Sequence, residues 1–413
     1  MTKAIITISF ILGIFFLQLA SAEVPQEKQP IISAYQYQHA SSIFSENRRY
    51  MVSLPARYHA NKHNYPSLYI VDADFQFQHV SAMVKNLARM GKIPPMIVVG
   101  IANQGDDDYL KSNTWSDSKD EAFGGAAKFQ QYLKSELIPL IESQYRTNQQ
   151  KALSGYSLGG LFTLYSMMQQ ETPFNAFISM SPSAWFDENS LPAKLEPMLQ
   201  QGKLTYPVFI SLANEEGMGV DKVIEVFNKS APNELNWQYK HYPNENHYTT
   251  ALPAFYDGLQ FLAPNYAIDG TDMLALGDYQ QVLTHFNTQR QQWAGFHLGW
   301  LQAWQFVKYL SWSKQLDKVD EILTALNEQF PDYVTTVTIQ LAKGYNKRKD
   351  FGRVVQLLES VKVDGQALPG WHKQMSNYYN GIEQPKLGQK HQKLALKLVK
   401  QYQLESWEVW EFN

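Results

Sequence analysis

The stretch "LSGYSLGGLF", residues 153–162, places Ser157 between glycines, after one apolar run and before another. A Gly-x-Ser-x-Gly string indicates a nucleophilic serine only where a strand precedes it and a helix follows it. Gly155 and Gly159 lack the β-carbons that would crowd such a turn, and Gly160 would allow close packing against a sheet. An ordinary glycine-rich turn is the alternative. The rest of the chain must therefore supply a base, an acid and an oxyanion site.

The segments around this stretch alternate short β-rich runs with longer helical patterns, from about residue 42 to residue 262. Seven runs predict strands: "RRYMVSLP", "SLYIVDA", "PMIVVGIA", "KALSG", "NAFISMS", "YPVFISLA" and "NWQYKHYP". Apolar residues at helical spacing predict helices over "AAKFQQYLKSELIPLIESQY" and "LFTLYSMMQQ". This order predicts an α/β fold with a mainly parallel sheet covered by helices. It also gives Ser157 a strand before it and a helix after it.

The β signal fades after "LAPNYAIDGTD", residues 262–272, and helical patterns follow. Three segments there resemble one another, each with an aromatic residue or Leu three positions before a Val: Tyr279 and Val282, Leu316 and Val319, and Phe351 and Val354. Their spacings of 37 and 35 residues are typical of paired-helix repeats of the tetratricopeptide type. A plain helical bundle is the alternative. We expect an α/β domain over residues 23–262 and an all-α, tetratricopeptide-like domain over residues 263–413.

Residues 1–22 have the pattern of a signal peptide. Lys3 supplies a positive charge, an apolar stretch runs from Ile5 to Leu19, and "ASA" offers a small-residue cleavage site. The apolar run is short for a bilayer span, and an uncleaved anchor is the alternative. We expect cleavage after Ala22, no membrane span in the mature protein, and a secreted, periplasmic location.

The composition excludes several function classes. A net charge of −3 with 18% charged residues gives no electrostatic reason to expect nucleic acid as a partner. The chain contains no Cys, which rules out disulfides, thiol catalysis and thiolate metal sites.

A serine nucleophile needs an imidazole to take its proton and a carboxylate to orient that imidazole. His247 follows the last predicted strand in a polar loop, and we prefer it to His241, which alternation places on the strand. For the acid, "ANEEG" follows a strand and offers Glu215, or Glu216 as the second choice. The alternative is that both glutamates only begin the next helix, where acids interact favourably with the helix dipole.

The oxyanion site needs two backbone N–H groups directed at the charge that develops in the transition state. Leu158 should supply one, because the residue after the nucleophile begins the helix with a free amide. The second should follow an earlier central strand, and Asp72 to Asp74 in "YIVDADF" are the candidates.

At these residues the chain resembles the enterochelin-esterase and IroE-like branch of the putative esterase family, within the α/β-hydrolase superfamily. The resemblance covers about 220 residues in ordered motifs: "SENRRYMVSLPARY", "YPSLYIVDADFQF", "PPMIVVGIAN", "ELIPLIESQYRT", "LSGYSLGGLFTLY", "FISMSPSAWFD" and "NENHYTT". It implies that Ser157 is the nucleophile, His247 the base and Glu215 the acid.

The same resemblance implies roles for residues around this triad. It indicates that Asp74 donates the second oxyanion amide and that Trp185, in "SPSAWF", borders the substrate pocket. We also assign Tyr156, next to the nucleophile, to substrate binding.

One segment departs from the family. Members often carry an arginine-bearing stretch after the "VVGI" strand, whereas this chain has "NQGDDDYLKSNTW" with Asp106, Asp107 and Asp108. Three acids would repel an anionic ligand, so a catecholate siderophore is a doubtful substrate. Asp72, Asp74 and His79 could suggest a metal, but a serine mechanism needs none, and we expect no metal and no cofactor.

The sequence therefore predicts a secreted serine carboxylesterase that cleaves a small-molecule ester through an acyl-enzyme. An acyltransferase using the same triad is one alternative. A non-catalytic scaffold that binds a protein or peptide partner on the helical domain is another.

Overall fold

The computed structural model describes residues 32–115 and 121–412. The expected signal peptide, residues 1–22, lies outside the described residues. The sheet and the helices that follow it belong to one compact unit, Ser33–Asn413. No helix among the described residues has the length and apolar character needed to cross a bilayer.

The centre of the fold is an eight-stranded sheet with the order β1-β2-β4-β3-β5-β6-β7-β8. Strands β3 to β8 run parallel to one another, whereas β1 and β2 form an antiparallel edge that joins the parallel part through β4. The strands are β1 Tyr35–Ser41, β2 Glu46–Ser53, β3 Tyr65–Val71, β4 Ile97–Ile101, β5 Thr147–Tyr156, β6 Ala176–Met180, β7 Val208–Ala213 and β8 Trp237–Tyr242.

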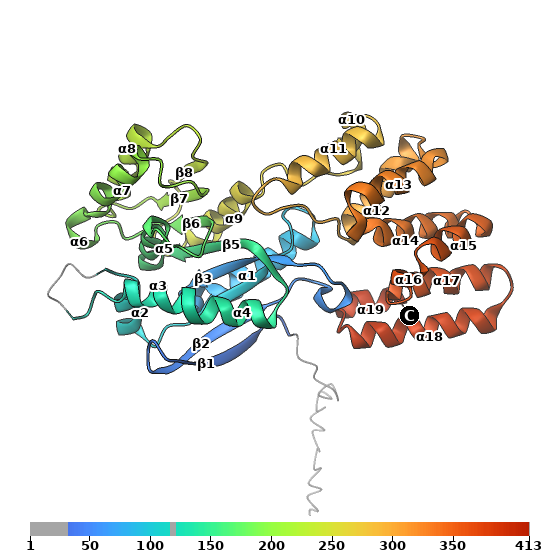
Figure 1. Cartoon of the computed structure of the whole chain (residues 1–413), viewed down its shortest axis with the longest axis horizontal. Coiled ribbons are helices and arrows are strands. Elements are labelled where there is room, and N and C mark those ends of the chain that lie inside the picture. The colour runs from blue at the N-terminus through green and yellow to red at the C-terminus, as the bar shows by residue number, and fades with distance from the viewer. Residues whose placement is uncertain (1–31, 116–120, 413) are drawn as a thin grey trace, which may run out of the picture. The chain divides into compact units, whose positions relative to one another are not determined.

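Helices cover both faces of the sheet (Figure 1). On one face lie α3 Ala126–Tyr132, α4 Ile138–Gln144, α5 Leu158–Met168, α7 Leu191–Gln200 and α8 Val220–Ser230. On the other face lie α1 Ala73–Arg89 and α9 Ala251–Leu262. Shorter elements are η1 Tyr58–Ala60, α2 Asp106–Ser112, η2 Leu133–Leu137 and α6 Phe186–Asn189.

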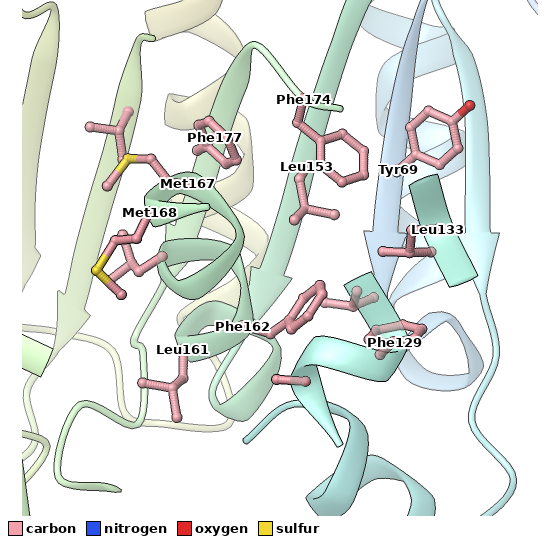
Figure 2. Packing of buried hydrophobic residues seen from close by; sticks show 14 of the residues in the cluster. Tyr69, Phe129, Leu133, Leu153, Leu161, Phe162, Met167, Met168, Phe174 and Phe177 are labelled. Atoms are coloured by element: carbon pink, nitrogen blue, oxygen red, sulfur yellow. The ribbon is translucent and has the colours of Figure 1, made fainter. Parts of the chain in front are cut away.

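The core between the sheet and the first helical layer is rich in large apolar side chains. Figure 2 shows Phe162 of α5 beside Phe129 of α3, and their ring centroids are 4.8 Å apart. Leu153 of β5 and Phe177 of β6 are fully buried in the same cluster. Burial of this apolar surface fixes α5, and with it the residue that precedes α5, against the sheet.

The predicted α/β fold is confirmed, and each of the seven predicted strands corresponds to one of β2 to β8. The helix predicted over residues 126–145 is present as α3, the π-helical turn η2 and α4. Strand β1 was not predicted. Its "YQYQHAS" sequence is largely solvent-exposed because it forms the outer edge of the sheet, so it lacks the apolar run of a central strand.

Beyond α9 the described chain is helical, as predicted. The elements are α10 Gly270–Leu276, α11 Tyr279–Arg290, α12 Trp300–Trp312, η3 Leu316–Lys318, α13 Val319–Gln329, α14 Pro331–Lys347, α15 Phe351–Ser360, α16 Lys362–Gly365, α17 Pro369–Gly381, α18 Pro385–Gln401 and α19 Ser406–Phe412. The recurring valines Val282, Val319 and Val354 are all fully buried in α11, α13 and α15. The tetratricopeptide type and the domain boundary at residue 262 stay predictions.

Helix α19 and the residue before it contact the sheet region through ion pairs. Glu408 pairs with Arg57, and Glu405 pairs with Arg89 and, at 2.8 Å, with Lys85. The carboxylate of Glu408 is almost fully buried. Because an unpaired buried charge is costly, these contacts tie the last helix to α1 and to the segment after β2.

Candidate active site

Ser157 lies at the sharp turn between β5 and α5. Its backbone has φ 58° and ψ −119°, a conformation that L residues rarely adopt. The turn is held by backbone hydrogen bonds, because the Ser157 amide donates to Met180 O at 3.0 Å and its carbonyl accepts from the Ser183 amide at 3.0 Å. The predicted strand-to-helix context of the serine is therefore present.

The glycines at this turn are required by sterics. A β-carbon at Gly155 would lie 2.0 Å from the carbonyl oxygen of Gly159, and one at Gly160 would lie 2.9 Å from that of Met180. Both contacts are with backbone, which cannot move aside as a flexible side chain can. The positions thus need glycine for the tight turn and for close helix–sheet packing, as predicted.

The structure brings Ser157, His247 and Glu215 together. Nε2 of His247 lies 3.0 Å from Oγ of Ser157, and Nδ1 lies 2.7 Å from Oε2 of Glu215. Both distances are within hydrogen-bond range. The three side chains follow the carboxyl ends of β5, β7 and β8. Strands β7 and β8 are adjacent in the sheet, and β6 lies between β5 and β7. Glu216, the second choice for the acid, is solvent-exposed, and Nδ1 of His247 lies against Glu215 instead.

Backbone contacts hold the two loops that carry the acid and the histidine. The amide of Asn214 donates to the carbonyl of Glu245 at 2.8 Å, which joins the loop after β7 to the loop after β8. Within the second loop, Oδ1 of Asn246 accepts from the amide of Tyr248 at 2.9 Å. His247 is therefore placed by a hydrogen-bonded turn rather than by a free loop.

Tyr156 packs against the histidine. Its ring centroid lies 4.9 Å from that of His247, and its hydroxyl donates to the His247 carbonyl oxygen. Burial, with a smaller effect of the Glu215 carboxylate, raises the pKa of the Tyr156 phenol, so the hydroxyl stays protonated as a donor. This contact supports the imidazole, whereas the substrate-binding role assigned to Tyr156 stays a prediction.

The predicted oxyanion residues begin two helices. Leu158 is the first residue of α5, and Asp74 lies in the first turn of α1, after β3. β3 and β5 are neighbours in the sheet, so the two helix starts share one edge. The Asp74 carboxylate is turned to other partners, accepting from the Asn103 amide at 3.0 Å and from Arg49 at 3.2 Å. The role of the two backbone amides stays a prediction.

Asp72 is a buried acid at the same edge. It has φ 61° and accepts a hydrogen bond from Nδ2 of Asn103 at 3.2 Å. Burial and the neighbouring Asp74 carboxylate raise the pKa of Asp72 to about 7, more than the hydrogen bond from Asn103 lowers it.

Tyr109 of α2 is a residue at the site that the sequence analysis missed. Its hydroxyl donates to the carbonyl of Tyr156 at 3.2 Å and accepts from the amide of Gly159 at 3.3 Å. Desolvation raises the pKa of this phenol, against the opposing effect of its contacts with Gly159, the Ser157 side chain and the Leu158 amide. The only signal in the sequence was the position of this tyrosine shortly after a central strand.

The acidic run beside Tyr109 differs from expectation. Asp106 and Asp107 are exposed, but Asp108 pairs at 2.8 Å with Arg48, whose side chain is fully buried. Burial alone would raise the pKa of Asp108, but hydrogen bonds from Arg48, Gln104 and Ser112 outweigh it and lower the pKa. The expectation that all three acids would repel an anionic ligand therefore does not hold for Asp108, whose charge is neutralised by Arg48 inside the fold.

Trp185 follows β6 and is 43% exposed. It lies two residues after Ser183, whose Oγ is 3.2 Å from Oγ of Ser157. The exposed Trp185 ring therefore lies close in sequence to Ser183, which contacts the nucleophile. Its place at the border of the substrate pocket stays a prediction. Tyr248, beside His247, is also exposed.

Among the described residues, no group of three or more His, Asp and Glu side chains is arranged to hold a metal ion. His79 is half-buried, and desolvation lowers the pKa of its imidazole. A large cavity of about 1010 Å³ lies elsewhere, at the amino ends of β3 and β4 and against the C-terminal helices. Ser157, Glu215 and His247 do not line it, so the candidate site is defined by hydrogen-bond geometry and not by this cavity.

Comparisons with known proteins show the family of this chain. The family model described as "Putative esterase" matches residues 41–247, half of the chain. The uncharacterised Bacillus subtilis protein YbbA is 27% identical over 177 residues, 41% of this chain and 70% of YbbA. The ferri-bacillibactin esterase BesA of the same species is 25% identical over 37% of this chain and 60% of its own length, so the chain spans less than two thirds of BesA. The crystal structure of an IroE-like serine hydrolase from Shewanella oneidensis superposes with a TM-score of 0.61 at 27% identity, over 72% of this chain and 99% of that one.

Proposed function

The chain belongs to the putative esterase family and is an esterase of α/β-hydrolase fold, and from this premise we propose that it is an exported serine carboxylesterase. The observation that carries the proposal is the line of hydrogen-bond distances from Glu215 through His247 to Ser157, 2.7 Å and 3.0 Å long. A binding scaffold would have no need for these three groups in catalytic order.

In the proposed reaction, Nε2 of His247 takes the Ser157 proton while Oγ bonds to the ester carbonyl carbon. The Glu215 carboxylate holds the imidazole and stabilises the imidazolium that forms. When the tetrahedral intermediate collapses, the ester C–O bond breaks and the alcohol leaves with the proton from His247. Water, deprotonated by the same imidazole, then hydrolyses the acyl-enzyme and regenerates Ser157.

The proposed substrate is a small-molecule carboxylic ester without strong negative charge. Asp106 and Asp107 remain exposed at the start of α2, on the helix that carries Tyr109 to the nucleophile. Their charges disfavour an anionic ligand, which argues against a catecholate siderophore even though relatives include a ferri-bacillibactin esterase. A panel of esters matched in size and differing in charge tests this, and faster turnover of the anionic members would contradict it.

The test of the serine mechanism is substitution of the nucleophile. Ser157→Ala should abolish both hydrolysis of p-nitrophenyl acetate and covalent labelling by a fluorophosphonate. Ser143→Ala, an exposed serine of α4, is the matched control and should leave both unchanged. Labelling of Ser157→Ala equal to that of the parent protein would refute the proposal. Product analysis with added alcohols distinguishes hydrolysis from acyl transfer, because only a transferase forms a new ester.

Export to the periplasm is proposed from residues 1–22 alone. Mass spectrometry of the mature protein should find Glu23 as its first residue. A mature chain that retains Met1 would contradict the proposal.

A further inference from the structure

Tyr109 reaches the nucleophile from an element that carries no member of the triad. Its hydroxyl lies between the carbonyl of Tyr156, the residue before Ser157, and the amide of Gly159, two residues after it. Desolvation raises the pKa of this phenol, and the nearby Ser157 side chain and Leu158 amide oppose that shift. The phenol oxygen is therefore located at the first turn of α5, beside the amide expected to bind the oxyanion.

We propose that the hydroxyl of Tyr109 is a catalytic hydrogen-bond donor to the oxyanion, acting beside the backbone amide of Leu158. The inference rests on the proposed esterase function and adds a side chain to its machinery. As Oγ of Ser157 bonds to the carbonyl carbon, the electron pair of the C=O double bond moves to the oxygen at the start of α5. The Tyr109 O–H turns from the Tyr156 carbonyl to this negative oxygen and keeps its own proton. The serine proton still passes to His247.

The anchoring of α2 fixes the position of the phenol oxygen, so that only rotation of its O–H bond is needed to reach the oxyanion. The residue before Tyr109, Asp108, is paired with the fully buried Arg48 at 2.8 Å and accepts from the hydroxyl of Ser112 at 3.0 Å. The body of the tyrosine packs against the main hydrophobic core. A donor fixed in advance loses little free energy to reorganisation when charge develops, which is why such groups stabilise a transition state more than the ground state.

His247 and Ser183 already occupy the other hydrogen-bonding positions around Oγ of Ser157, at 3.0 Å and 3.2 Å. Tyr109 therefore does not act as the base. Burial keeps its phenol in the protonated form, which can donate but cannot accept the serine proton.

The decisive variant is Tyr109→Phe, which removes the hydroxyl and keeps the ring. We expect kcat for p-nitrophenyl acetate to fall about 100-fold with little change in KM, the result of removing one oxyanion donor. A trifluoromethyl ketone, which forms a tetrahedral adduct with a serine, should lose affinity in parallel, and the corresponding methyl ketone should not. The matched control is Tyr132→Phe, a buried tyrosine of α3 whose hydroxyl has no hydrogen-bond partner among the described residues.

Equal kcat values for Tyr109→Phe and Tyr132→Phe would overturn this inference and leave the proposed esterase intact. Absence of hydrolysis and labelling in the parent protein would overturn both together. If Tyr109→Phe does not fold, replacement of Tyr109 by 3,5-difluorotyrosine keeps the shape and makes the phenol more acidic. The alkaline limb of the kcat profile should then move to lower pH, and an unmoved profile would overturn the inference.

Discussion

The carboxylate of Glu215 lies 2.7 Å from Nδ1 of His247, on the side of the imidazole opposite Ser157. Glu215→Gln should lower kcat for ester hydrolysis by about 10³- to 10⁴-fold, because an amide neither fixes the correct tautomer nor stabilises the imidazolium. Glu216→Gln, the exposed neighbour, is the control and should leave kcat unchanged. A larger loss of kcat in Glu216→Gln than in Glu215→Gln would show that Glu215 is not the acid.

Asp72 gives the protein a pH-dependent stability. Its pKa rises from 3.8 to about 7 on folding, so the contribution of Asp72 to stability is full below about pH 4 and is lost as the pH rises through 7. Asp72→Asn cannot ionise, and Asn tolerates the left-handed backbone at this position. Relative to the parent, the variant should gain about 2 to 4 kcal/mol of unfolding free energy between pH 4 and pH 8.

Urea unfolding at several pH values measures this gain, and Asp107→Asn serves as an exposed control. A parent and an Asp72→Asn variant with parallel stability profiles would show that Asp72 titrates normally in the folded protein.

The buried ion pair between Arg48 and Asp108 predicts unequal effects within the acidic run. Asp108→Ala leaves the fully buried Arg48 guanidinium with the half-exposed Glu46 as its remaining carboxylate partner among the described residues and should cost about 3 to 5 kcal/mol of stability. Asp107→Ala should change stability by less than about 0.5 kcal/mol, as is usual for exposed positions. Thermal unfolding of the two variants compares them directly, and similar melting temperatures would contradict the structural role of Asp108.

Replacement of glycine by alanine should have opposite effects at Gly155 and Gly344. Gly155→Ala places a methyl group 2.0 Å from the Gly159 carbonyl and should prevent folding of the turn or abolish activity. Gly344→Ala adds a methyl group in open space within α14 and should stabilise the protein by up to about 1 kcal/mol. Circular dichroism melting and ester hydrolysis report the two effects. A Gly155→Ala variant with parental activity would show that the turn can relax.

The meeting of Ser157, Glu215 and His247 could be predicted because the three residues obey a general rule of parallel sheets. Ser157, Glu215 and His247 each follow a strand, and the carboxyl ends of parallel strands share one edge. The recognisable order of the three residue types along the chain then selects them from the other polar residues.

Tyr109 and Asp108 could not be predicted by such a rule. Tyr109 meets the nucleophile turn through a contact between helix α2 and residues about fifty positions away, with no motif to signal it. The sequence "DDDY", residues 106–109, does not indicate which of its three acids is directed into the fold. That depends on the buried Arg48, which lies on a strand sixty positions earlier. The edge strand β1 could not be predicted either, because its exposed residues carry no apolar pattern.

The pairing of Arg57 with Glu408 has a consequence for the order of folding. These residues are 351 positions apart, so the ribosome must add most of the chain after Arg57 before its partner exists. Until residues 405 and 408 are synthesised, Arg57, Lys85 and Arg89 lack these carboxylate partners. A translation product that stops before residue 405 would leave all three cations without these partners.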